Sequence, residues 1–399
     1  MKTETTEYLF AERTENVPQS FIREILKVAS NPNITSFAGG LPNPAFFPVD
    51  KLAVCAAKVF QENGMQALQY AATEGYFPLR EYISKRYRQR YHIDIPPERI
   101  LITSGSQQAL DLIGKIFINP GDEVMLERPT YLGALQCLSV FQPVFREVQM
   151  KQDGVDTEDL KMELGWNDIK LFYAIPNFQN PTGIQYSLET RKKTAEILSH
   201  YKTIIIEDDP YGDIFFNEER IAPIYSCLPD QTILLGSFSK TIAPGLRLGW
   251  MVANEDIIRK ATIMKQASDL HSGNLTQYIL YRFLQEYDID DHIAIIQNAY
   301  RKQRDVMMDC LNSYFPASVS YTIPAGGMFT WITLPNGITS REFLQQALEK
   351  DIIFVPGDSF YACNPDSQTL RLNYSNVEEG QMRKAMKMLG EMVDKISCL

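Results

Sequence analysis

Short apolar runs recur from about residue 99 onward, and segments with the apolar spacing of helices separate them. The runs that predict strands are 100–103, 123–126, 171–175, 203–206, 233–236 and 249–252. Several are apolar on both alternating faces, as parallel strands need when helices cover both sides of their sheet. Helices are predicted between them at 106–118, 188–200 and 255–267. This alternation predicts an α/β domain with a mostly parallel sheet.

The pattern changes after about residue 275. Long helical stretches are predicted at 276–287 and 291–313, followed by strand-like runs at 328–332 and 370–374 and a closing helix at about 377–396. Because strand and helix no longer alternate strictly, this part predicts a smaller α+β domain. The first forty or so residues have the features of an arm, in which Ser20 caps a short amphipathic helix over 21–29 that ends at Asn31-Pro32-Asn33.

The composition is that of an ordinary soluble globular protein, since 45% of the 399 residues are hydrophobic and 22% are charged. The length predicts two or three domains. A net charge of -10 and a pI of about 5.1 fit an enzyme of small metabolites, whereas a nucleic-acid-binding protein would need a concentrated basic patch. The densest basic run, 85–90, is interpreted as the exposed face of a helix.

Cysteine and histidine positions bear on compartment and metal binding. The six cysteines show no CxxC spacing, which indicates a reducing compartment with mostly buried, inert thiols. The four histidines show no ligand spacing, so no metal site is expected. The acidic stretch 1–7 lacks the apolar segment of a secretory signal, and no apolar run is long enough to span a bilayer. We expect a cytoplasmic protein that binds neither membrane nor nucleic acid.

Lys240 follows a predicted strand and lies among small residues in the segment 236–250. Arg247 follows seven positions later (247 minus 240). A lysine that forms an imine must lose its proton, which a confined site near other cations favours. The hydroxyls of Ser237 and Ser239 and the guanidinium of Arg247 could bind a phosphate beside it. The alternative interpretation is a surface loop with an ordinary solvated lysine.

The run 203–206 leads directly into acids, among them Asp208 and Asp209, and then to Tyr211. Ligands of open α/β sheets bind at the carboxyl ends of strands. An acid there could pair with a protonated ring nitrogen and keep it charged, and each pKa unit of such a shift is worth about 1.4 kcal/mol. The alternative is a loop acid that caps the next element.

Two further strands also break into polar loops. Asn180 lies in the amide-rich loop 174–183, and the proline after it favours an extended conformation that could aim its amide at a ligand oxygen. Strand 100–103 turns through Gly105 into a helix beginning at Ser106, and the free N–H groups of a helix start suit a phosphate. A plain Asn-Pro turn and a Ser-capped helix without ligand are the alternatives. No GxxxxGK[ST] or GxGxxG motif supports a nucleotide.

Together these strand ends supply a phosphate site, an acid for a ring nitrogen, an amide donor and an amine nucleophile. Pyridoxal 5′-phosphate (PLP) needs this set. The residues resemble those of the class I aminotransferases of the fold type I PLP-dependent enzymes, most of all the branch with 2-aminoadipate (LysN-type) and kynurenine aminotransferases. The resemblance runs from about Ser20 to Ser397, and the motifs that carry it are SFAGGLP at 36–42, LQY at 68–70, TEGY at 73–76, GSQQ at 105–108, NPTG at 180–183 and GSFSK at 236–240.

The resemblance implies an N-terminal arm at 1–44 that partly packs with the small domain. It implies a large PLP-binding domain at 45–290, with a mostly parallel seven-stranded sheet between helices, and a small α+β domain at 291–399. It also implies a homodimer with shared active sites.

The resemblance also implies a role for each matching residue. Lys240 would link the cofactor covalently and later move the proton between the substrate Cα and the cofactor C4′. Asp208 would pair with the pyridinium nitrogen; its neighbour Asp209 is the competing choice. Tyr211 and Asn180 would hydrogen-bond the ring O3′, while Tyr131 would stack on the ring.

Phosphate and substrate would be held by further residues. The phosphate would bind Ser106, Gln107, Ser237, Ser239, Arg247 and the partner subunit's Tyr70. The substrate α-carboxylate would form a bidentate pair with Arg371, helped by Gly40 and Asn180. Arg23 stands where relatives with long acidic substrates place an arginine that reads the side chain; the alternative is a surface residue on the arm.

The implied reaction is a ping-pong transfer from an L-amino acid to 2-oxoglutarate. The donor is either 2-aminoadipate or a broad set that includes aromatic and branched-chain amino acids. The same residues would also serve a PLP-dependent β-lyase or decarboxylase, so these stay open. A non-enzymatic sensor domain is disfavoured because only about thirty-five residues precede the SFAGG motif, too few for a DNA-binding module.

Overall fold

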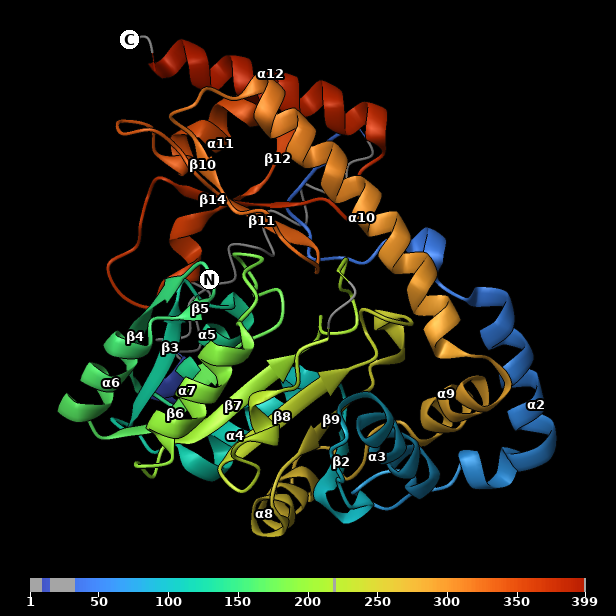
Figure 1. Ribbon diagram of the computed structural model, residues 1–399. Helices are drawn as coiled ribbons and strands as arrows, with labels where there is room; N and C mark the ends of the chain where they lie inside the picture. The colour runs from blue at the N-terminus through green and yellow to red at the C-terminus, as the bar shows by residue number, and fades with distance from the viewer. Residues whose placement is uncertain (1–8, 15–32, 218–219, 398–399) are drawn as a thin grey trace, which may run out of the picture.

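The computed structural model describes residues 9–14, 33–217 and 220–397, and Figure 1 shows their arrangement. The helix expected over 21–29 lies outside the described residues. Single 3-10 turns lie at Glu12–Thr14, Pro44–Phe46, Pro97–Arg99, Ile224–Ser226, Pro244–Leu246 and Gly357–Phe360.

The larger sheet is mixed and mostly parallel. Within the described ranges it has eight strands, in the order β2 (Ile100–Thr103), β9 (Gly249–Val252), β8 (Thr232–Ser237), β7 (Ile204–Asp209), β6 (Ile169–Ala174), β3 (Glu123–Arg128), β4 (Val144–Lys151) and β5 (Gly154–Val155). Strands β8, β7, β6, β3 and β4 are parallel, while β9 is antiparallel to both of its neighbours. The α/β fold with a mostly parallel sheet is therefore confirmed.

The expected strand number of seven is wrong by one, because the two-residue strand β5 pairs antiparallel with β4. Strand β4 also has no counterpart among the apolar runs that predicted strands. Its sequence, VFREVQMK, carries charges, and only Val148 is fully buried. A strand close to the sheet's edge does not need two apolar faces, so its sequence lacks that signal.

Alternate strand residues pack against helices on opposite faces of this sheet. Val124 and Leu126 belong to a core shared with α4 (Ser106–Phe117), α5 (Leu132–Ser139) and α8 (Glu255–Gln266). Met125, between them, packs with α6 (Thr157–Trp166) and α7 (Leu188–Leu198). Side chains that point alternately to two covered faces explain why these strands read as continuous apolar runs.

Side chains of the preceding residue cap three of these helices. Asp156, Ser187 and Asn254 accept hydrogen bonds from backbone N–H groups in the first turns of α6, α7 and α8. Each such cap stabilises a helix by about 1 kcal/mol. The helices therefore begin where the sequence supplies a polar cap.

Helices α2 (Val49–Ala67), α3 (Phe77–Tyr91) and α9 (Asn274–Glu286) cover the β2 end of the sheet. The basic run 85–90 lies on α3, but the expectation of an exposed face is only partly right. Arg86 and Arg90 are 14% and 6% exposed and form ion pairs with Asp213 and Asp290. These carboxylates come from distant segments, so the local pattern could not indicate them.

The smaller sheet is antiparallel and has the strand order β10 (Ser320–Tyr321), β11 (Phe329–Thr333), β14 (Thr369–Asn373) and β13 (Val355–Pro356). Its helices are α10 (Ile289–Tyr314), α11 (Ser340–Leu348) and α12 (Glu379–Ser397). In Figure 1, α10 runs from beside α9 to α12, against which it packs. Near the beginning of the chain, β1 (Thr35–Ser36) pairs with β12 (Ile352–Ile353). Among the described helices, none is long and apolar enough to cross a membrane.

The expectation of mostly buried thiols is wrong for the cysteines that the structure describes. Cys55 and Cys310 are buried and Cys137 is half-buried, whereas Cys227 and Cys363 are exposed. Scattered spacing predicts unpaired cysteines, but it carries no information about their burial.

Candidate active site

A cavity of about 300 Å³ lies at the carboxyl ends of β6, β7 and β8. Its walls come from segments that are far apart in the sequence, and they consist of Gly40, Leu41, Gly105, Ser106, Gln107, Leu110, Tyr131, Ile175, Asn180, Asp208, Pro210, Tyr211, Ser237, Ser239, Lys240, Pro244, Arg247 and Arg371. Of the candidate residues that the structure describes, all line this cavity except Tyr70 and the competing acid Asp209. Ligands of open α/β sheets bind at this position.

Lys240 follows β8 and its Nζ donates a hydrogen bond to the carbonyl oxygen of Gly40 at 2.8 Å. Burial lowers the pKa of Lys240 to about 8, with Arg371 and Arg247 acting in the same direction. Both effects disfavour the charged ammonium. The amine is therefore available as a nucleophile near neutral pH.

Asp208 lies near the end of β7 and is buried. Its Oδ2 accepts a hydrogen bond from the Tyr173 hydroxyl at 2.8 Å, whereas its Oδ1 is buried without a partner among the described residues. Burial raises the pKa of Asp208 to about 7, although the Tyr173 hydrogen bond opposes this rise. A buried acceptor without a donor costs about 1–3 kcal/mol. A protonated ring nitrogen in the cavity would supply that donor.

Asp209, the competing acid, does not face the larger cavity. It accepts hydrogen bonds from the Asn177 side chain and the Gly212 backbone N–H, both at 2.9 Å. It lines a separate small cavity of about 40 Å³, together with Arg90 and Trp250. Of the two acids, only Asp208 lines the larger cavity.

Arg371 comes from β14 and is buried at the opposite wall. Its guanidinium donates to Asn180 Oδ1 and to the carbonyl oxygen of Ala38, both at 2.7 Å. It lies 4.2 Å from the centre of the Phe329 ring and 5.1 Å from that of Phe360. Burial lowers the pKa of Arg371 to about 10, so the side chain stays charged at neutral pH. A fixed, desolvated guanidinium suits a carboxylate ligand.

Asn180 is hydrogen-bonded to both Arg371 and Tyr211. Its Oδ1 accepts from Arg371, and its Nδ2 donates to the Tyr211 hydroxyl at 3.4 Å. Burial raises the pKa of Tyr211, so the phenol stays protonated. Asn180 and Tyr211 therefore present polar atoms between Asp208 and Arg371.

The turn between β2 and α4 has the features of an anion site. Gly105 has a φ of +81°, and a Cβ there would lie 2.9 Å from the Arg247 guanidinium. The positive φ favours glycine, and a Cβ would also displace the Arg247 guanidinium. The backbone N–H groups at the start of α4, beginning with Ser106, and the guanidinium of Arg247 border the cavity, with Ser237 and Ser239 at the same end. A helix start beside an arginine suits a phosphate.

Tyr131 immediately precedes α5. A Cβ at Gly133 would lie 2.4 Å from the Tyr131 ring, so this glycine leaves room for the ring above its own helix. Gln107 donates to the Gly133 carbonyl oxygen at 3.0 Å, which connects the starts of α4 and α5.

Two expected residues are not part of the site as described. Tyr70 is 79% exposed, lies outside its own chain's cavity, and meets the His271 ring edge-on with 5.8 Å between centroids. Arg23 lies outside the described residues.

Sequence reasoning missed several residues of the site. Tyr173, Ala38, Phe329 and Phe360 hold the charged groups in place but were not singled out. For Tyr173 a signal was present, since a tyrosine within the buried run 171–175 needs a hydrogen-bond partner. The other contacts depend on tertiary packing alone.

The residues of the cavity fit the cofactor expected from the sequence. The unpartnered Asp208 Oδ1 suits a protonated ring nitrogen, the lowered pKa of Lys240 suits condensation with an aldehyde, and the β2–α4 turn suits a phosphate.

Comparisons with known proteins agree with this geometry. The family model described as "Aminotransferase class I and II" matches residues 43–389. The aromatic-amino-acid aminotransferase 1 of Thermococcus litoralis is 39% identical over 97% of this chain and 94% of its own length. The 2-aminoadipate transaminase of Thermus thermophilus is 36% identical over 98% of both chains. The solved structure of Pyrococcus horikoshii kynurenine aminotransferase, in complex with PMP, is 38% identical with a TM-score of 0.92 over 97% of both chains.

Proposed function

The chain belongs to the class I and II aminotransferases and depends on PLP, and on this premise we propose which amino acids it uses and which residues act. We propose that it transfers the amino group of an L-amino acid to 2-oxoglutarate by a ping-pong mechanism. The donor is either 2-aminoadipate or a broad set that includes aromatic and branched-chain amino acids. The different substrates in the names of its relatives, aromatic amino acids, 2-aminoadipate and kynurenine, support this range.

The proposal depends most on one observation. The same cavity contains an amine whose pKa is lowered to about 8 and a buried carboxyl with one unpartnered oxygen. When bound, PLP supplies an aldehyde that condenses with amines and a protonated ring that accepts the electron pair released at the substrate Cα. Lys240 and Asp208 are the residues that suit these two features.

We assign proton transfer to Lys240. Its amine holds the cofactor until the substrate amine displaces it, and the freed amine then takes the proton from the substrate Cα and delivers it to the cofactor C4′. A pKa of about 8 gives a substantial unprotonated fraction at mildly alkaline pH, as a general base requires. The Gly40 carbonyl, which accepts from Nζ at 2.8 Å, gives the freed amine a resting position.

We assign orientation of the ring to four residues. Asp208 Oδ1 accepts from the ring N–H and so keeps the ring charged, which favours loss of the Cα proton. Tyr211 and Asn180 donate to the ring O3′, and Tyr131 packs against the ring face. Their convergence on one cavity supports this assignment.

We assign the two anionic groups to opposite ends of the cavity. The cofactor phosphate binds Ser106, Gln107, Ser237, Ser239 and Arg247, close to the β2–α4 turn. The substrate α-carboxylate binds Arg371, with Asn180 and the Gly40 backbone beside it. A 2-oxo acid carries the same carboxylate, so Arg371 serves both halves of the ping-pong cycle.

We propose a homodimer in which the partner subunit's Tyr70 completes each phosphate site. Large apolar side chains are exposed on α2 and near its end, as expected of a surface that a second copy covers: Phe60, Met65, Leu68 and Tyr70.

A cytoplasmic location also stays a prediction, which cell fractionation would test.

A substrate panel tests the proposed reaction. Holoenzyme is incubated with single L-amino acids and 2-oxoglutarate, and glutamate is measured together with the 2-oxo acid of the donor. We expect equal amounts of the two products. Pyruvate with ammonia, or CO₂, without glutamate would instead indicate a β-lyase or a decarboxylase and would contradict the proposal.

The same panel on Arg23→Ala tests the choice of donor. If Arg23 reads an acidic side chain, activity with 2-aminoadipate falls while activity with aromatic donors is kept. Unchanged selectivity would remove Arg23 from the site.

A further inference from the structure

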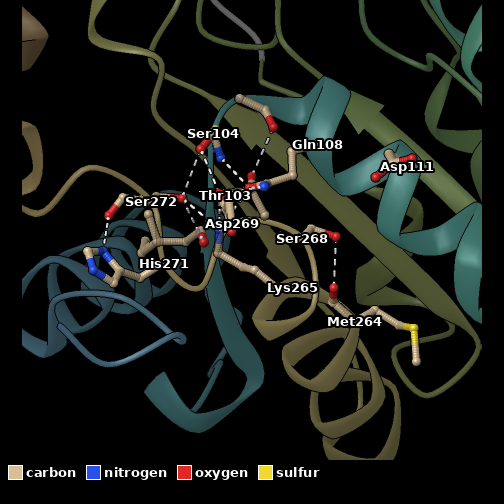
Figure 2. Close-up of polar contacts among 12 residues, drawn as sticks. Thr103, Ser104, Gln108, Asp111, Met264, Lys265, Ser268, Asp269, His271 and Ser272 are labelled. Carbon is tan, nitrogen blue, oxygen red and sulfur yellow. Dashed lines mark hydrogen bonds and ion pairs between the residues drawn. The ribbon is translucent and has the colours of Figure 1, made fainter. Parts of the chain in front are cut away.

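An ion pair between a fully buried lysine and a partly exposed aspartate lies beside the β2–α4 turn, and Figure 2 shows its contacts. Lys265, near the end of α8, has no exposed surface. Its Nζ donates to both carboxylate oxygens of Asp269 at 2.8 and 2.9 Å, to Gln108 Oε1 at 2.9 Å and to Ser272 Oγ at 3.0 Å. The N–H groups of the ammonium therefore all donate within one cluster, which consists of Lys265, Asp269, Gln108 and Ser272.

The cluster holds Ser104, the residue before Gly105. Gln108 Oε1, which accepts from Lys265, also accepts from the Ser104 backbone N–H at 2.8 Å. The Ser104 hydroxyl lies 3.2 Å from Ser272 Oγ and 3.4 Å from Asp269 Oδ2. On the other side of the same residue, the Ser104 carbonyl oxygen accepts from the Arg247 guanidinium at 3.1 Å. Ser104 thus connects the cluster with Arg247.

Asp269 makes the charge of Lys265 important for an anion site. Gln108 Nε2 donates to Asp269 Oδ2 at 2.6 Å, so this carboxylate lies next to the first turn of α4. An unpaired carboxylate there would repel a phosphate bound at the same turn. Although burial acts in the opposite direction, hydrogen bonds from Lys265 and Gln108 lower the pKa of Asp269. Burial lowers the pKa of Lys265 too, but its hydrogen bond to Asp269 opposes this, and the contacts at 2.8 and 2.9 Å fit an ionised pair.

Stability alone is a weak reason for this arrangement. Removing a lysine from water carries a penalty of several kcal/mol, and a carboxylate that is 31% exposed offsets little of it because water screens the attraction. Position is the better explanation, because Lys265 on α8 binds Gln108 of α4 and both Asp269 and Ser272 of the turn that follows α8. The ammonium fixes these segments relative to one another.

We propose that Lys265 is a positioning residue of the phosphate anchor. With Asp269 and Gln108 it fixes Ser104, so that the free N–H groups at the start of α4 and the guanidinium of Arg247 converge on the phosphate. This inference rests on the phosphate position proposed above. Lys265 itself does not touch the cofactor.

The test compares PLP with pyridoxal, which has the same ring and aldehyde but no phosphate. Cofactor-free protein is titrated with each compound, and the dissociation constants are measured from protein fluorescence. For Lys265→Met, which nearly conserves side-chain volume, we expect PLP affinity to fall about tenfold or more, equivalent to about 1.4 kcal/mol. Pyridoxal affinity should change by less than about twofold, well under 1 kcal/mol.

Lys115→Met is the matched control. Lys115 also pairs with an aspartate on α4, Asp111, at 2.6 Å, and donates to Ser268 near the end of α8 at 2.8 Å. Unlike the partners of Lys265, neither Asp111 nor Ser268 has a hydrogen bond to Ser104 among the described contacts. This variant should keep the wild-type affinity for both compounds.

Two further variants keep the test decisive. Gln108→Met breaks the link to Ser104 without leaving a buried charge, and it should also weaken PLP selectively, even if Lys265→Met folds poorly. Adding Asp269→Asn to Lys265→Met removes the unpaired carboxylate and should restore part of the PLP affinity.

Two results would overturn the proposal, and a third would overturn its premise. Equal loss of PLP and pyridoxal affinity in Lys265→Met and Gln108→Met would indicate a purely structural role, and no loss of either would also overturn the proposal. Arg247→Met tests the premise separately. If that variant keeps the wild-type preference for PLP over pyridoxal, the proposed phosphate position is wrong, whatever Lys265 does.

Discussion

Asp208 is a buried carboxyl whose two oxygens have different surroundings. Oδ2 accepts the Tyr173 hydroxyl at 2.8 Å, while Oδ1 has no partner among the described residues. Tyr173 therefore occupies one oxygen and leaves the other free for the pairing with the ring nitrogen that we propose. Because its hydrogen bond favours the ionised carboxylate, Tyr173 opposes the rise in pKa that burial produces.

Tyr173→Phe should impair catalysis most at low pH. Without the hydrogen bond, the pKa of Asp208 rises further, so a smaller fraction is ionised at a given pH. A hydrogen bond to a charged group is worth about 1.5–3 kcal/mol, or about one to two pKa units. We expect the acid limb of the kcat/KM profile to move to higher pH by about one unit. The measurement is kcat/KM from pH 5 to 9 on the holoenzyme.

Tyr374→Phe is the matched control for Tyr173→Phe. It also removes a buried tyrosine hydroxyl, which donates to the Gly326 carbonyl oxygen at 2.8 Å, far in sequence from Asp208. This variant should lose about 1 kcal/mol of stability and keep the wild-type pH profile. A displaced profile in Tyr374→Phe, or an unmoved one in Tyr173→Phe, would refute the role of Tyr173.

At the scale of elements, the β2–α4 turn depends on one glycine. Gly105→Ala places a Cβ 2.9 Å from the Arg247 guanidinium at a φ of +81°. The strain amounts to about 1–3 kcal/mol, and the guanidinium must move away from the phosphate site. We expect PLP affinity of the cofactor-free protein to fall about tenfold, or about 1.4 kcal/mol. Titration with PLP measures this directly.

Gly165→Ala is the corresponding control. Gly165 lies on α6, where an added Cβ meets nothing within 4 Å. Alanine there should stabilise the helix by up to about 1 kcal/mol and leave PLP affinity unchanged. If both glycine variants bind PLP like the wild type, the turn does not need glycine for binding.

The local sequence pattern predicted the strands whose ends line the cavity, but it did not predict every strand of the larger sheet. The buried strands β6, β7 and β8 are nearly continuous apolar runs, and polar residues follow each of them, so Asn180, Asp208 and Lys240 could be found from the sequence. Strand β4 could not, because its charges resemble those of a loop.

Side chains that act through long-range contacts escaped prediction for a different reason. Lys265 lies in an amphipathic helix with one other lysine, and its sequence pattern indicates a solvated residue although it is buried. Its partner Gln108 is 157 residues away. Arg371 was placed only by family resemblance, since nothing around it in the sequence indicates its contact with the Ala38 carbonyl oxygen.

At the scale of the whole molecule, shared active sites can be tested by mixing two inactive forms. Lys240→Ala lacks the amine, and Tyr70→Ala lacks the side chain that we propose enters the partner's phosphate site. In a mixed dimer, one site has Lys240 from one subunit and the intact partner's Tyr70. We expect co-expression to restore about a quarter of wild-type activity, because random assortment makes half of the dimers mixed, each with one intact site.

The outcome separates shared from independent sites. If each chain used only its own residues, mixing would give no more than the average of the two parent activities. Sedimentation of the mixture, with the two forms carrying different tags, verifies that mixed dimers are present.

The central claim is that the Lys240 amine condenses with the cofactor aldehyde in this cavity. Reduction of the holoenzyme with borohydride makes that bond permanent, and mass spectrometry of the digested protein then locates it. We predict a pyridoxyl phosphate group on the peptide that contains Lys240. Its attachment to another lysine, or the absence of any modified peptide, would contradict the claim.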